Sequence, residues 1–179
     1  MIIRKLRFTD FYDINKLNDY SYTEIKTNPL FGTELYLKKP TLKVRLSQFN
    51  ELFKNLSEGN LIYYVAVEDL KIIGYCTVKK ADIPDSELSH VGILSIHVAH
   101  DFRNKGVGSK LLKYTLNKCI NKFDIVELNV FSNNIIAKRL YKKMGFKRWG
   151  IAPGFVKRGR GYIDLEHMYL DLRNKKRIK

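Results

Sequence analysis

The sequence predicts an α/β (α+β) fold with a mixed, twisted, mostly antiparallel central sheet flanked by helices on both faces. Three observations predict it. Apolar runs of strand length alternate with segments whose apolar residues recur at helical spacing. Two strand-like runs, 61–67 and 72–79, are joined by a short polar turn typical of a hairpin. No internal repeat divides the 179 residues, which favours a single domain, 1–172, with a basic tail, 173–179. The tail is expected to fray in solvent.

The N-terminal part of the chain is expected to form a strand and two helices. Residues 2–8 alternate apolar and basic side chains, as a half-buried strand does, and a helix over about 11–20 follows a Thr-Asp cap. Residues 23–42 contain two prolines and a glycine, which predicts an irregular connection ordered by leucine and aromatic side chains. A second helix is expected at 41–56, where apolar residues again recur at helical spacing.

The most informative stretch runs from Ile93 to Ile120. Ile93–Val98 is apolar and β-branched enough for a central strand, and the apolar residues of 107–120 fit a helix. Between them, Arg103–Gly108 is a turn with two glycines flanked by cations. Backbone N–H groups at a helix start lack internal partners, and the helix dipole adds positive charge there. An anion is therefore the natural ligand, although a plain strand-to-helix turn is an alternative.

Two familiar nucleotide-binding motifs do not fit this turn. A P-loop requires Gly-Lys-Ser/Thr, but here Gly108 is followed by Ser109-Lys110. The dinucleotide fingerprint requires a third glycine where Leu111 stands. What remains is R-x-x-G-x-G after a strand.

The rest of the chain completes an α/β pattern. The expected elements are a polar loop at 80–89, a strand at 124–130, a helix closed by Gly145-Phe146, a strand beginning at 147–150, a basic loop at 153–161 and a last strand at 163–172.

Two motifs resemble one known family. Arg103–Gly108, preceded by Leu94-x-Ile96-x-Val98, resembles the acetyl-coenzyme-A-binding signature of the GNAT superfamily of N-acyltransferases. Asn134–Phe146 is similar to the N-x-x-A-x-x-L-Y-x-x-x-G-F segment of that family, in the expected order and at the expected distance. One departure is His100, at a place where the family often has proline. The resemblance implies the GNAT acyltransferase fold and acetyl-CoA as cosubstrate.

The resemblance also implies which residues hold the coenzyme. Backbone N–H groups of the turn would bind the pyrophosphate, and the edge of the central strand would pair with the pantetheine arm. Asn134 would contact that arm, or else only cap a helix. The expected coenzyme-binding residues are Ile96, Val98, Arg103, Asn104, Lys105, Gly106, Val107, Gly108, Ser109, Asn134 and Tyr141.

Three residues are the catalytic candidates. Tyr141 matches the family tyrosine that protonates the departing thiolate, and its alternative is a core tyrosine. Deprotonation of the amine is expected through water beside a carboxylate, Glu87 or Asp164. Asp164 or Glu166 could hold a cationic amine, with ordinary strand polarity as the alternative. His97 alternates to the face opposite Leu94, Ile96 and Val98, so a packed or surface role is favoured over a catalytic one.

The resemblance implies an N-acetyltransferase that moves acetyl from acetyl-CoA to a primary amine by direct transfer in a ternary complex. The acceptor would be a small-molecule amine, a protein N-terminus or a lysine. The net charge of +15 favours anionic ligands and argues against a highly cationic acceptor. The alternative is a non-catalytic module of the same fold that binds CoA or RNA, motivated by the basic tail. No dense aromatic RNA motif supports it, so nucleic acid is not the expected partner.

Composition sets further expectations. The chain has no long apolar run and begins without a signal-like segment, so a cytoplasmic protein without a membrane partner is expected. Cys76 and Cys119 lie in apolar segments without metal-ligand spacing, which predicts two reduced core thiols and no metal site. A monomer or homodimer is expected.

Overall fold

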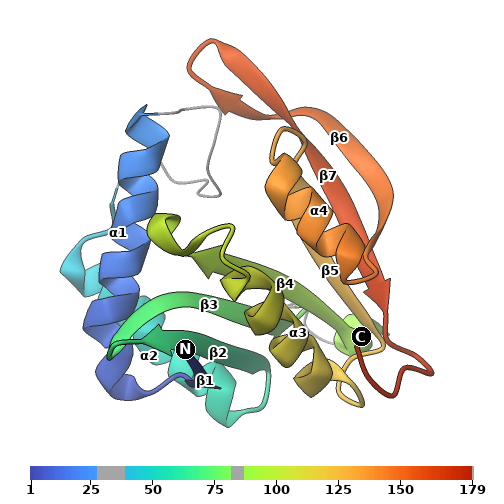
Figure 1. The fold of residues 1–179 in the computed structure, drawn as a ribbon, viewed down its shortest axis with the longest axis horizontal. Coiled ribbons are helices and arrows are strands. Elements are labelled where there is room, and N and C mark those ends of the chain that lie inside the picture. The colour runs from blue at the N-terminus through green and yellow to red at the C-terminus, as the bar shows by residue number, and fades with distance from the viewer. Residues whose placement is uncertain (28–38, 82–86, 179) are drawn as a thin grey trace.

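The computed structural model describes residues 1–27, 39–81 and 87–178. Within these residues, seven strands form one sheet in the order β1-β2-β3-β4-β5-β7-β6 (Figure 1). The pairing of β4 with β5 is parallel, and every other neighbouring pair is antiparallel. The predicted mixed, mostly antiparallel sheet is confirmed.

The helices and strands follow the predicted order. The strands are β1 (Ile2–Lys5), β2 (Leu61–Glu68), β3 (Lys71–Lys80), β4 (Val91–Val98), β5 (Ile125–Phe131), β6 (Lys147–Arg158) and β7 (Gly161–Asp171). The helices are α1 (Phe11–Thr27), α2 (Leu42–Ser57), α3 (Val107–Cys119) and α4 (Ile135–Lys143).

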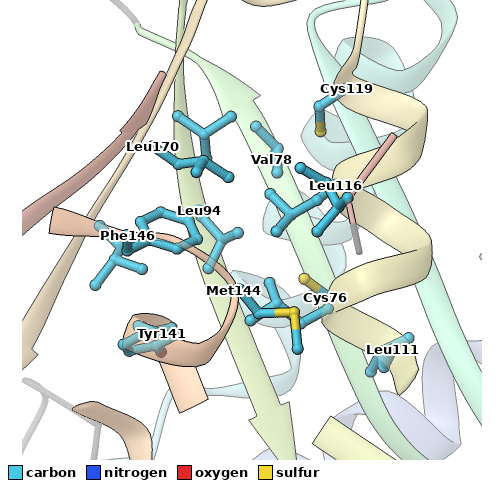
Figure 2. Packing of buried hydrophobic residues seen from close by; sticks show 14 of the residues in the cluster. Cys76, Val78, Leu94, Leu111, Leu116, Cys119, Tyr141, Met144, Phe146 and Leu170 are labelled. Atoms are coloured by element: carbon cyan, nitrogen blue, oxygen red, sulfur yellow. The ribbon is translucent and has the colours of Figure 1, made fainter. Parts of the chain in front are cut away.

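Helices cover both faces of the sheet, as predicted. Ile14 and Leu17 of α1 and Phe49 of α2 pack with Tyr63 and Val65 of β2 on one face. The larger core lies on the other face, where α3 and α4 pack on the even-numbered side chains of β4 and on β3, β5 and β7. Figure 2 shows this larger core from close by. Its labelled residues are Cys76, Val78, Leu94, Leu111, Leu116, Cys119, Tyr141, Met144, Phe146 and Leu170. Cys76 and Cys119 are buried free thiols, as predicted.

Two predicted boundaries are wrong. Helix α1 continues to Thr27 rather than ending near residue 20. The expected loop at 153–161 is mostly strand, because β6 runs to Arg158 and only Gly159 and Arg160 remain to turn the chain. A register shift between Ala152 and Val156 absorbs the proline and glycine that suggested a loop. The expectations for residues 28–38 and 82–86 lie outside the described residues.

The expectation that the basic tail frays in solvent is also wrong. Ile178 is buried in the larger core, and its backbone N–H donates to Asn117 Oδ1 of α3 at 2.9 Å. Arg173 folds back onto Asp171, with 2.7 Å between Nη2 and Oδ2. The single apolar side chain in the basic tail therefore ties its end to the domain. The division at residue 172 stays a prediction.

No helix in the described part of the chain is both long enough and apolar enough to cross a membrane.

Candidate functional site

Strands β4 and β5 separate along their length. Only Val91–Ile93 of β4 pair with β5, at Ile125–Glu127. In the described structure, Leu94–Val98 therefore have a strand partner only on the β3 side. Figure 1 shows the two strands diverging, with α3 and α4 in front of the divergence. Backbone groups of β4 therefore face an opening in the sheet.

The hydrogen-bond pattern identifies which backbone groups face this opening. Ala99 N donates to Ile73 O, and Ala81 N donates to Val91 O, both at 2.9 Å. Because hydrogen-bonded pairs alternate in an antiparallel ladder, the odd-numbered residues of β4 bond to β3. The N–H and C=O groups of Ile96 and Val98 therefore point away from β3, toward β5. An extended ligand arm could pair with these groups as an added strand would.

The turn after β4 carries the backbone geometry that an anion site needs. Asn104 and Gly106 both adopt the left-handed conformation, with φ of 59° and 80°. Gly106 is the residue before α3, and among the described residues no side chain caps this helix start. The first helical bond runs from Lys110 N to Gly106 O at 3.1 Å, which leaves the N–H groups of 107–109 without intrahelical partners. Helices α2 and α4, in contrast, are capped by side chains.

Arg103 is held by protein groups. Its Nε donates to Val98 O at 2.9 Å, and its two terminal nitrogens donate to the Glu24 carboxylate at 2.6 and 2.7 Å. This bidentate pair ties the turn to the C-terminal part of α1. Arg103 thus fixes the shape of the turn, and the anion site belongs to the backbone.

A cavity of about 450 Å³ joins the turn, the β4 edge and α4. Nine of the predicted coenzyme-binding residues line it: Ile96, Val98, Arg103, Asn104, Gly106, Gly108, Ser109, Asn134 and Tyr141. The other two, Lys105 and Val107, do not. The Val107 side chain is buried in the core, and Lys105 Nζ lies 5.7 Å from the centre of the Phe102 ring. The Val107 N–H is one of the helix-start groups without an intrahelical partner.

Tyr141 lines the cavity and also belongs to the core. Its ring lies beside that of Phe146 (Figure 2), with 5.8 Å between the ring centres. The residue is 7% exposed. Burial raises the pKa of the phenol above its ordinary value of 10. The hydroxyl therefore remains protonated at neutral pH, in the form that can donate a proton. The catalytic and the core interpretations of this residue are compatible.

Asn134 also combines its two predicted roles. Its Oδ1 accepts from Ala137 N at 3.1 Å and caps α4. The same residue lines the cavity. Because the cap uses the carbonyl oxygen, the amide NH₂ is the group left to donate toward a ligand.

The predicted carboxylates are not among the described residues that line this cavity. Glu87 is exposed on the short 3-10 turn before β4. Asp164 accepts from Gly154 N at 2.7 Å and supports the irregular part of β6. Glu166 is buried and paired with Lys138 Nζ of α4 at 2.7 Å. The roles of Glu87 and Asp164 as base remain predictions to which the cavity lends no support.

The cavity contains functional groups that sequence reasoning missed. Glu24 enters it from α1, and Arg139 and Lys143 enter it from α4 beside Leu140 and Ala137. The two α4 cations lie one turn apart and flank the same cavity as the uncapped helix start, which suits a ligand with several phosphates. Their four-residue spacing within the second motif was the available signal.

His97 lines the same cavity. The predicted alternation is correct: Leu94, Ile96 and Val98 join the larger core, whereas His97 contacts Tyr75 and Ser21 on the α1 face. Burial, assisted by the nearby Arg103 charge and opposed by Glu24, lowers the pKa of His97 from 6.5 to about 4. The ring is therefore neutral at physiological pH. The expectation of a packed histidine is fulfilled, but the packing leaves the ring in the cavity wall.

Among the described residues, no group of three or more His, Cys, Asp or Glu side chains could hold a metal ion.

The fold and site together define a class of protein. A parallel pair of strands that separates beside an uncapped helix start forms a binding site for an elongated ligand with an anionic end. The sequence profile described as the acetyltransferase (GNAT) family matches residues 30–146. The chain belongs to this family, and the resemblance read from the two motifs is confirmed.

Curated relatives have related names. The chain is 33% identical over 106 residues to the L-amino acid N-acetyltransferase AaaT of Escherichia coli K12, covering 58% of this chain and 64% of that protein. It is 27% identical over 126 residues to an N-alpha-acetyltransferase of Saccharolobus solfataricus, covering 65% of this chain and 71% of that protein. The match thus spans slightly less than two thirds of the first of these relatives.

Solved structures share the fold. The structure of yncA from Salmonella typhimurium, with its cofactor acetyl-CoA, superposes with a TM-score of 0.84 at 17% identity, covering 99% of this chain and 97% of that one. A ribosomal-protein-alanine N-acetyltransferase from Brucella melitensis superposes with a TM-score of 0.79 at 18% identity, covering 96% of this chain and 100% of that one. The predicted GNAT fold is confirmed.

Proposed function

We propose that this protein is an acetyl-CoA-dependent N-acetyltransferase that transfers the acetyl group directly to a primary amine in a ternary complex. The observation that carries the proposal is the single cavity shared by the uncapped start of α3, the outward-facing edge of β4 and Tyr141. Family membership supports it independently. Acetyl-CoA would supply an activated carbonyl and a thiolate leaving group.

Different groups of the chain would bind different parts of acetyl-CoA. The N–H groups of 107–109 and the α4 cations Arg139 and Lys143 would hold the phosphates. The outward N–H and C=O groups of Ile96 would pair with the pantetheine arm, as a neighbouring strand does. Val98 O already accepts from Arg103 Nε, so its N–H is the more available group of that residue.

Tyr141 would act as the general acid. A buried phenol stays protonated until well above neutral pH, so the donor form is always populated. A thiolate whose conjugate acid has a pKa of about 8.5 is a weaker base than phenolate, and the transfer therefore depends on poor hydration of the sulfur. The burial of Tyr141 provides such a water-poor surrounding.

The acceptor that we propose is an α-amino group, on a free amino acid or at a peptide N-terminus. Relatives named for L-amino acid and N-alpha acetylation support this choice. The net charge of +15 disfavours polycationic amines, because the field of the protein repels them.

The test is an acceptor screen with the intact protein and acetyl-CoA. Free L-amino acids, peptides with free N-termini and a polyamine are compared by thiol release, with acetylated products identified by mass spectrometry. Acetylation of an amino acid or peptide N-terminus supports the proposal. A protein that binds acetyl-CoA but acetylates none of these acceptors contradicts it. RNA binding that weakens with salt, without acetyl transfer, would instead favour the non-catalytic alternative.

A further inference from the structure

His97 is a polar side chain in the cavity to which the proposed mechanism gives no task. It is 7% exposed, yet it lines the cavity together with Tyr141 and the β4 edge. Its neighbours in β4, Ile96 and Val98, turn their side chains to the opposite face of the sheet. The backbone that would hold the thioester arm thus lies between His97 on one side and Tyr141 on the other.

The ring of His97 is held on the α1 side by two contacts. Ser21 Oγ of α1 lies 3.3 Å from Nε2 and 3.4 Å from Nδ1, within hydrogen-bonding distance of either ring nitrogen. The Tyr75 ring of β3 lies 5.6 Å away and supports one side. Because a hydroxyl has one proton, Ser21 can donate to only one nitrogen at a time. Neutral imidazole has one N–H and one acceptor nitrogen, so when its N–H donates to Ser21 Oγ the other nitrogen is left to accept a proton from a ligand.

The charged and titratable groups around the ring are Glu24 on α1, Arg103 on the turn before α3 and Tyr75 on β3. Glu24 and Arg103 neutralise each other in a bidentate pair. Burial and Arg103 both oppose a positive charge on the ring and lower the pKa of His97 to about 4, so the ring is neutral and accepts a proton only from a nitrogen that attack on the carbonyl has made strongly acidic. The same surroundings disfavour an ammonium group beside the ring. An acceptor at this position would therefore be a free amine, ready to attack.

We infer that His97 is a further catalytic residue, which accepts the proton that the acceptor amine loses during acetyl transfer, while Ser21 orients its ring. The inference rests on the proposed function. The attacking amine would then lose its proton to His97, and the departing thiolate would gain one from Tyr141, on the opposite face of β4.

The proposed step balances in atoms and charge. The lone pair of the amine forms a C–N bond to the thioester carbonyl carbon, and the carbonyl electrons move to oxygen. The nitrogen then loses a proton to His97. The carbonyl re-forms, the C–S bond breaks, and the sulfur takes the proton of Tyr141. Exchange with solvent returns a proton from His97 to Tyr141, which leaves an amide and a free thiol.

The experiment compares His97→Ala with His100→Ala as a matched control. The His100 side chain is 73% exposed on the 3-10 turn after β4, and among the described residues it is not part of the cavity wall. Acetyl-CoA affinity is measured by calorimetry, and kcat is measured with the best amino acid or peptide acceptor of the screen. We expect His97→Ala to lower kcat about 100-fold, the typical loss of a general base, while the Kd of acetyl-CoA changes less than about twofold. His100→Ala should leave both values unchanged.

Two further measurements separate catalysis from structure. Added imidazole should restore part of the lost turnover of His97→Ala, because it can occupy the vacated space and accept the proton. Ser21→Ala keeps the imidazole and should lower kcat about three- to tenfold, the loss of one orienting hydrogen bond. Wild-type kcat in a folded His97→Ala protein overturns the inference but leaves the proposed function intact. A loss of kcat without imidazole rescue, together with a loss of acetyl-CoA binding, also overturns it, because the role would then be structural. Absence of transfer by the wild type overturns both.

Discussion

Acid should destabilise the fold through His97. Its pKa falls from 6.5 to about 4 on folding, because burial and Arg103 disfavour the charged ring. The unfolded chain therefore binds more protons than the folded chain between these two values, and stability falls as the pH is lowered through that window. The full difference in pKa corresponds to roughly 3 kcal/mol of unfolding free energy, of which about 2.5 kcal/mol is lost between pH 7.5 and 4.5.

Urea unfolding at these two pH values measures the effect. Wild type is compared with His97→Gln, which keeps a polar group near Ser21 but does not titrate. The loss of unfolding free energy on acidification should be smaller in the variant by about 2.5 kcal/mol. His100→Gln, at an exposed position, should behave as wild type. An equal acid loss in wild type and His97→Gln would refute the reasoning that the folded environment keeps this ring neutral.

Three other predictions concern the turn before α3, the basic tail and the ion pair between α4 and β7. Gly106→Ala should lower the unfolding free energy by about 1 kcal/mol and weaken acetyl-CoA binding, because Gly106 has a φ of 80°. Gly150→Ala, at an open position of ordinary φ, is the control. Equal effects of the two substitutions in urea unfolding and calorimetry would contradict the role of the turn. Ile178→Ala should lower the unfolding free energy by about 2–4 kcal/mol, and a change below about 0.5 kcal/mol would mean that the tail is not packed. Lys138→Met should destabilise by about 3 kcal/mol, because it leaves the buried Glu166 unpaired, and Lys138→Met with Glu166→Gln should recover part of the loss; no recovery in urea unfolding would argue against the pair.

The turn after β4 could be predicted because its requirements are local. A left-handed backbone before a helix selects glycine, and the apolar run before it selects a buried strand, so residues 93–108 indicate their structure directly. The second motif then added α4 and Tyr141 in the same way. Local signals of this kind account for most of the coenzyme side of the cavity.

The missed groups depend on contacts distant in sequence. Glu24 meets Arg103 across 79 residues, and Ser21 meets His97 across 76, so no spacing rule could pair them. The misjudged end of α1 removed Glu24 from consideration, because residue 24 was expected in an irregular connection. His97 was correctly assigned to the other face of β4, but the face alone does not say that the cavity extends to it.

The errors at the C-terminal end have a similar cause. Pro153 and Gly154 usually break strands, but the Asp164 carboxylate accepts the Gly154 N–H and the register shift accommodates both residues. Ile178 is one apolar residue among basic ones, and its burial depends on Asn117 accepting its backbone N–H. Tertiary contacts override local preference at both places.

Calorimetric titration of the intact protein with acetyl-CoA tests the central claim most directly. The cavity that joins the α3 start, the β4 edge and Tyr141 predicts saturable binding at one site per chain, accompanied by a rise in thermal stability. Gly150→Ala should bind as wild type does, and Gly106→Ala should bind more weakly. An absence of binding heat and of any thermal shift at millimolar acetyl-CoA would contradict the account.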